Sequence, residues 1–150
     1  MDDTPDFEFS AEQLVEKARE FFRKGRLGEA EACLRKAIEL EPERSAWRLN
    51  LGVTLQAAGR GEEALQCFEM ACQCAPKHAE PRLAAAMAAA ALGRWPVALK
   101  WAEQATLFDP SLDAGWGCRV ESLRRLGRRD DAMVAFYLAQ QNLEIMPATL

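Results

Sequence analysis

Small residues recur along this chain at a spacing of 34 positions. The strictest positions hold glycine, alanine and proline, and they are Gly25, Gly59, Gly93 and Gly127, then Ala30, Ala64, Ala98 and Ala132, then Ala37, Ala71, Ala105 and Ala139, and finally Pro42, Pro76 and Pro110. A fixed period of this length is typical of arrays in which each unit packs on its neighbours. The period predicts four units, at 11–44, 45–78, 79–112 and 113–146, between tails at 1–10 and 147–150.

Each unit is predicted to fold as two helices joined by a short turn. Ser10 and Gln13 have the spacing of a capping box, which indicates a helix beginning at residue 11. The periodic glycine ends that helix, because a left-handed residue after a helix end costs glycine little. Leu34, Phe68 and Phe136 each follow a periodic alanine by four residues, so they share its helix face and are expected to fill the hairpin. The expected fold class is therefore all-α.

The residues of the units resemble the tetratricopeptide repeat, whose signature runs Trp-x2-Leu-Gly-x2-Tyr, then Ala-x3-Phe, then Pro. The quoted matches are Leu51-Gly52-x2-Leu55, Ala64-x3-Phe68, Ala71 and Pro76 in the second unit, and Trp116, Leu123, Ala132-x3-Phe136 and Ala139 in the fourth. The signature's glycine is replaced by Ala86 in the third unit and by Val120 in the fourth. The resemblance implies a right-handed superhelical solenoid of antiparallel helical hairpins. It also implies a scaffold, without chemistry of its own, that binds a peptide or partner helix.

The same resemblance implies that the first helix of each unit lines a concave groove. The candidate peptide-binding residues are Leu49, Asn50, Val53, Leu83 and Met87 along its centre, with Arg124 and Arg125 at the far rim. An apolar strip between charged ends suits the apolar side chains of a partner. We expect Asn50 to bond a ligand's backbone and the two arginines to tune salt dependence and association rate. The chain's own termini are the alternative occupants of the groove.

Two narrower groups within the family make different predictions. One grips the C-terminal carboxylate of chaperones with lysine, asparagine and arginine, but only Asn50 matches here, and positions expected to be basic hold Val15, Glu80 and Ala84. The sequence thus disfavours that clamp. The other group comprises the class II chaperones of type III secretion, which are small acidic cytoplasmic proteins. The segments 80–82 and 136–140 are similar to pieces of that group, so a secretion chaperone is an alternative function.

Composition and charge are those of one globular domain of 150 residues, with 49% hydrophobic residues and a net charge of −4. The acidic tail at 1–10 accounts for this net charge, because residues 11–150 hold 19 acidic and 19 basic residues. A balanced body lacks the basic footprint that nucleic acid requires, and we interpret the arginines at 124, 125, 128 and 129 as a solvated cluster. The sequence shows neither a secretory leader nor a membrane span, so we expect a cytoplasmic protein.

The cysteines and the single histidine offer no convincing chemistry. Five cysteines in a domain of this length are expected to be reduced thiols. Cys72, Cys74 and His78 lack a fourth zinc ligand, and the two cysteines point about 200° apart on a helix. His78 has no phosphate loop or paired acids beside it. We therefore expect no enzyme, no cofactor and no metal site.

The last predicted helix is apolar on every side over residues 132–139. Such a helix requires burial on more than one side, so something is expected to cover it. The candidates are a second copy of the chain, a partner, the residues after Leu143, or a downstream segment if the chain is a fragment. Met133 and Tyr137 are the residues expected on the outer side, where we expect an intermolecular contact, and a homo-oligomer through this helix is one of the alternatives. A self-assembling structural protein is accordingly another alternative function.

Overall fold

The computed structural model describes residues 8–144, and all regular structure in that part of the chain is α-helical. The helices are α1 (Ala11–Arg23), α2 (Leu27–Leu40), α3 (Ser45–Ala57), α4 (Gly61–Cys74), α5 (Ala79–Ala91), α6 (Trp95–Phe108), α7 (Asp113–Arg125) and α8 (Arg129–Glu144). The all-α fold class is confirmed. Most of the predicted acidic tail and all of the predicted tail at 147–150 lie outside the described residues.

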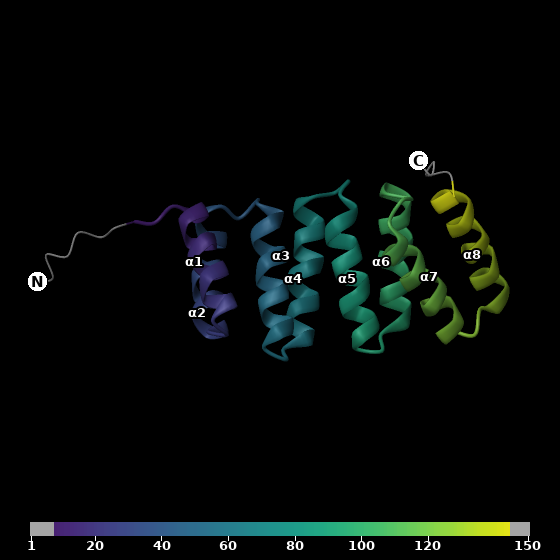
Figure 1. Ribbon diagram of the computed structural model, residues 1–150, viewed down its shortest axis with the longest axis horizontal. Coiled ribbons are helices and arrows are strands. Elements are labelled where there is room, and N and C mark those ends of the chain that lie inside the picture. Colours follow the sequence, from purple (N-terminus) through teal and green to yellow (C-terminus); the bar gives the residue numbers. More distant parts are fainter. Residues whose placement is uncertain (1–7, 145–150) are drawn as a thin grey trace, which may run out of the picture.

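The helices form four antiparallel hairpins that stack in a row from α1 to α8 (Figure 1). Each hairpin packs its second helix against the first helix of the next one, as α2 does on α3, α4 on α5 and α6 on α7. The first helices also contact one another, α3 with α5 and α5 with α7, which places them together on the inner side. The result is the solenoid of antiparallel helical hairpins that the resemblance implies.

The hairpin turns confirm the predicted helix ends. Ser10 and Gln13 form the capping box, in which the Gln13 N–H donates to Ser10 Oγ at 3.2 Å. Gly25, Gly59 and Gly93 have φ of 74°, 77° and 73°, in the left-handed region that suits glycine. One residue later, a backbone N–H donates back across the glycine to a carbonyl five residues earlier, as in a Schellman motif. The turns are therefore fixed locally by the periodic glycines.

The periodic alanines lie on the second helix of each hairpin, and those of the first three units are completely buried. One further residue on each helix of a hairpin determines how the space between the two helices is filled. In the second hairpin, a Cβ on Gly52 would lie 2.4 Å from Cε1 of Phe68, so the Phe68 ring occupies space that only glycine leaves free. The equivalent pair in the first hairpin is Ala18 and Leu34. There the first helix carries a larger residue than Gly52 and the second helix a smaller one than Phe68.

The fourth hairpin departs from this packing, and the expectation that Phe136 fills it is wrong. Phe136 is 52% exposed, whereas Phe68 at the equivalent position is 1% exposed. Val120 stands where Gly52 stands in the second hairpin, so its side chain takes the space that an inserted ring would need. The ring is turned out, and a separate small core of Leu99, Leu123, Ala132 and Ala135 joins α8 to the array.

Ion pairs connect neighbouring hairpins along their turns. Arg60 donates to Glu31 at 2.7 Å, and Arg94 donates to Glu62 at 2.6 Å. Burial on its own would raise the pKa of Glu31, but hydrogen bonds from Arg60 and Arg35 outweigh it and hold that pKa below its ordinary value. A carboxylate with a lowered native pKa stabilises the fold at neutral pH, and this contribution is lost as the pH falls through that pKa.

Replacing Gly52 with alanine should destabilise the protein by about 1 to 3 kcal/mol, because the new methyl group overlaps the Phe68 ring. Gly117→Ala is the matched control in another first helix. No atom lies within 4 Å of its added Cβ, so this variant should gain up to about 1 kcal/mol from helix propensity. Urea unfolding measures both changes. Adding Phe68→Leu to Gly52→Ala recreates the pair of the first hairpin and should recover stability, and a double variant no better than Gly52→Ala would contradict this packing.

Replacing Glu31 with glutamine should lower the free energy of unfolding at neutral pH by less than about 1 kcal/mol, because the pair with Arg60 lies at the surface. The difference from the wild type should shrink as the pH falls from about 6 to about 3, where the wild-type carboxylate also becomes neutral. Glu29→Gln is the control, since Glu29 pairs with Arg26 inside one hairpin. Denaturant unfolding across this pH range gives the result. A difference that stays constant with pH would refute the assigned role of Glu31.

Candidate functional site

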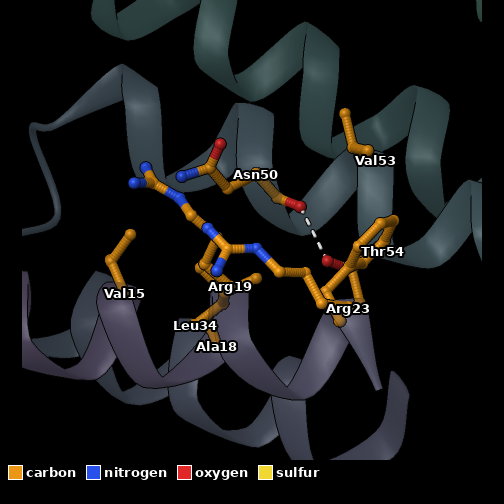
Figure 2. Close-up of a pocket in the computed structure, with 9 residues that line it drawn as sticks. Val15, Ala18, Arg19, Arg23, Leu34, Asn50, Val53 and Thr54 are labelled. Carbon is orange, nitrogen blue, oxygen red and sulfur yellow. Dashed lines mark hydrogen bonds between the residues drawn. The ribbon is translucent and has the colours of Figure 1, made fainter. Parts of the chain in front are cut away.

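The first hollow on the inner side lies between α1 and α3 and has a volume of about 280 Å³. Its lining residues are Val15, Ala18, Arg19, Phe22, Arg23, Leu34, Asn50, Val53 and Thr54. We call it the α1–α3 hollow. Figure 2 shows the side chains of Arg19, Arg23 and Asn50 extending into the space between the two helices. The hollow thus combines apolar, amide and cationic groups.

Helical spacing explains this combination. Val15, Arg19 and Arg23 are four residues apart on α1, so they share one face of that helix. On α3, Asn50 and Thr54 share a face in the same way, and Thr54 Oγ1 donates to the Asn50 carbonyl oxygen at 2.9 Å. The acceptor is the backbone oxygen of Asn50, and among residues 8–144 the Asn50 side-chain amide makes no hydrogen bond.

The floor of the α1–α3 hollow is apolar and its rim is cationic. Val15, Ala18 and Leu34 are buried, while both arginines are exposed. Arg19 donates to Glu16 at 3.3 Å in a solvent-exposed pair, which contributes little. Within residues 8–144, Arg23 makes no ion pair with a carboxylate. An incoming carboxylate would therefore meet at least one guanidinium that has no competing partner there.

A second hollow, the α5–α7 hollow, has a volume of about 290 Å³ and lies further along the inner side. Its lining residues are Met87, Ala90, Trp95, Ala114, Gly117, Cys118 and Glu121. Burial raises the pKa of the Cys118 thiol, so this cysteine stays neutral at physiological pH. The hollow is mainly apolar, with one carboxylate at its edge.

That carboxylate restrains the two arginines predicted at the far rim. Glu121 accepts a hydrogen bond from Arg124 at 3.0 Å and one from Arg125 at 2.8 Å. The bond from Arg125 is the main reason that the pKa of Glu121 lies below its ordinary value. The Arg125 guanidinium also lies 5.1 Å from the centre of the Trp95 ring. Both arginines are thus exposed, but Glu121 offsets much of their charge.

The structure divides the predicted central strip. Asn50 and Val53 line the α1–α3 hollow, and Met87 lines the α5–α7 hollow. Leu49 and Leu83 are half-buried and line neither hollow. The seven candidate residues therefore do not surround one site, and their role in binding stays a prediction.

Most residues that line the hollows, Arg19, Arg23 and Trp95 among them, were not among the seven candidates. The sequence did place Arg19 and Arg23 on the groove side of the first unit, where they share the helix face of Val15 by four-residue spacing. Trp95 lies in the first turn of α6, a second helix, and reaches the α5–α7 hollow from there. A prediction that draws the groove from first helices alone could not find it.

The thiols and the histidine lie apart from both hollows, except for Cys118. Burial raises the pKa of the Cys72 thiol to about 11, and Cys74 lies 3.4 Å from an Arg48 nitrogen. His78 is exposed before α5, where its backbone carbonyl accepts a bond from the buried Arg82. Across residues 8–144, no three histidine, cysteine or acidic side chains come close enough together to hold a metal ion. No helix in that range is both long and apolar enough to cross a bilayer.

Comparison with known proteins agrees with this architecture. A sequence model of the tetratricopeptide repeat matches residues 15–79. The match identifies residues 15–79 as tetratricopeptide repeats, and the helical array extends the same fold over the described part of the chain. No curated protein sequence matches it.

Solved structures of the same fold include the crystal structure of MamA, with a TM-score of 0.81 and 17% identity over 90% of this chain and 79% of that one. A tetratricopeptide repeat protein from Parabacteroides merdae has a TM-score of 0.80 and 25% identity, over 92% of this chain and 55% of the other. The first repeat domain of Spaghetti (RPAP3), bound to the HSP90 peptide SRMEEVD, has a TM-score of 0.73 and 19% identity over 79% and 94%. These similarities establish the fold.

Proposed function

We propose that this protein is an adaptor that binds a peptide segment of a partner protein along its inner side. The observation that carries the proposal is the α1–α3 hollow, where an apolar floor lies beneath Arg19, Arg23 and Asn50. Concave sites with an apolar lining and a few convergent polar groups are typical ligand sites. A repeat protein of the same fold that holds a peptide supports this class of ligand.

The residues that line the α1–α3 hollow determine which chemical groups of a ligand fit there. A carboxylate, from an acidic side chain or a chain end, forms charge-assisted hydrogen bonds with guanidinium groups. An apolar side chain of the same segment fits against Val15, Phe22 and Val53, and the Asn50 amide bonds its backbone. This arrangement differs from the chaperone-tail clamp, because its basic residues are Arg19 and Arg23 rather than residues at positions 15, 80 and 84.

The α5–α7 hollow supplies a second, apolar anchor point in this proposal. Met87 is 53% exposed beside Trp95, so a ligand side chain that covers both removes apolar surface from water. Leu49 and Leu83 lie along the first helices between the hollows. Arg124 and Arg125, already paired with Glu121, act in this proposal on salt dependence and association rate.

An adaptor of this kind needs no catalysis, and we infer neither an enzymatic activity, a nucleic-acid ligand nor membrane binding. We also propose that it works in the cytoplasm, which fits its five unpaired cysteines. Within the described residues 8–144, no contact favours the alternative of a type III secretion chaperone. Self-assembly, the other alternative, is supported by the surface of α8.

Selection from a library of random displayed peptides should enrich segments that contain a carboxylate and an apolar residue. Arg23→Ala and Asn50→Ala should each weaken the selected peptides by about 10- to 100-fold, because each variant removes a polar partner of the bound segment. Met87→Asp should weaken longer peptides that reach the α5–α7 hollow. Titration calorimetry or fluorescence anisotropy measures these affinities.

Lys36→Ala is the matched control, since it removes one exposed cation from α2, outside both hollows. It should bind as the wild type does. Leu83→Asp is unsuitable as a test because this residue is half-buried, so an introduced charge there threatens the fold. Selected peptides that bind Arg23→Ala and Asn50→Ala with wild-type affinity, or a library that yields no binder, would refute the proposal.

A further inference from the structure

The outer surface of α8 is apolar in its middle, although nothing among the described residues covers it. Met133, Val134, Tyr137 and Leu138 are 58%, 57%, 59% and 37% exposed. No charged residue occurs from Ala132 to Ala139. A contiguous apolar surface on a soluble protein marks an interaction site. A further repeat, the opposite end of the array and a second copy of α8 are the surfaces that could cover it.

A further repeat stacked on α8 would not cover this surface. In the register of 34 residues, Met133 corresponds to Leu99, which is buried at the contact between α6 and the next hairpin. The other three positions correspond to Lys100 and Glu103, which stay exposed beside the next hairpin, and to Gln104, which is half-buried and accepts a hydrogen bond from Arg82 of its own hairpin. A following hairpin would therefore leave Val134, Tyr137 and Leu138 in water. These three residues require a partner on the outer side.

The opposite end of the array does not supply that partner. The positions of Trp47 and Leu51, which are buried in α3, are occupied in α1 by Gln13 and Lys17, and both are exposed. The free flank of the first hairpin is thus polar. Head-to-tail stacking would bury these polar groups against the apolar surface of α8 without hydrogen-bond partners, which is unfavourable.

The spacing of residues on α8 points to a second copy of the same helix. Asp130, Val134, Tyr137 and Gln141 are four, three and four residues apart, so they form one straight stripe like the seam of a coiled coil. This spacing reads the same in both directions along the helix. Met133 and Leu138 extend the symmetry, because one precedes Val134 and the other follows Tyr137.

We propose that two copies of this protein pair through α8, with the two helices antiparallel about a two-fold axis. Val134 of each copy then faces Tyr137 of the other, while Met133 and Leu138 flank this contact on opposite sides of the seam. The apolar residues of α8 in one copy then pack against the same residues in the other copy, as an isologous interface requires. Charge selects the antiparallel direction: it sets Asp130 against the uncharged Gln141, whereas a parallel pair would set the two Asp130 carboxylates against each other.

The test transplants the polar residues of α6 onto α8 in the triple variant Val134→Lys, Tyr137→Glu and Leu138→Gln. These side chains already occupy equivalent positions of a folded hairpin, so the fold should persist, as circular dichroism would verify. Sedimentation velocity should find the wild type as a dimer at micromolar concentration. The triple variant should raise the dimer dissociation constant by about 100-fold or more.

Met70→Lys is the control, because Met70 is an exposed methionine at the position equivalent to Leu138 on α4. It should leave the dimer unchanged. Peptide binding at the α1–α3 hollow should survive the triple variant, which separates failure of this proposal from failure of the adaptor function. A monomeric wild type, or a triple variant that still forms the dimer, would overturn the pairing through α8.

The direction of the helices has its own test at Gln141. In the antiparallel pair, Gln141→Lys faces Asp130 and should tighten the dimer by about 3- to 10-fold, whereas Gln141→Glu should weaken it by a similar factor. In a parallel pair, position 141 faces itself, so both variants would weaken the dimer. That second pattern would contradict the arrangement proposed.

Discussion

The array depends on how closely the two helices of each hairpin approach each other. Buried alanines permit that approach, and one further pair of positions then decides how the space between the helices is filled. Alanine with leucine and glycine with phenylalanine are two solutions of similar volume, seen in the first and second hairpins. Valine with phenylalanine in the fourth hairpin exceeds that volume, so Phe136 turns out. Close packing leaves no room for both side chains.

This constraint links the fold to both surfaces for which we propose a role. The first hairpins pack tightly, which fixes α1 and α3 at the separation that forms the α1–α3 hollow. The fourth hairpin has only a small core of its own and exposes the apolar outer side of α8. The two ends of the chain thus differ in chemistry. One end has a hollow with a cationic rim, and the other has an apolar helix face.

Much of the fold was predictable because its signals are local and periodic. Gly25 and its equivalents mark the hairpin turns, and Ser10 with Gln13 marks the first helix, since each acts through backbone groups a few residues away. The site was only partly predictable. Helix spacing identified Asn50, Val53 and Met87 as inner-side residues. Their division between two hollows depends on contacts between helices, and so does the contribution of Trp95 from α6. The exposure of Phe136 follows from Val120, sixteen residues away in the sequence, which a repeat signature treats as a tolerated substitution.

The central claim is that the α1–α3 hollow binds the peptide, and hydrogen exchange tests it most directly. Exchange of the backbone amides is compared between the free protein and the protein saturated with a selected peptide. The account predicts slower exchange in α1 and α3, centred on the turns that carry Arg19, Arg23 and Asn50, with α4 and α8 unchanged. Slowing confined to the second helices, with α1 and α3 unaffected, would contradict it.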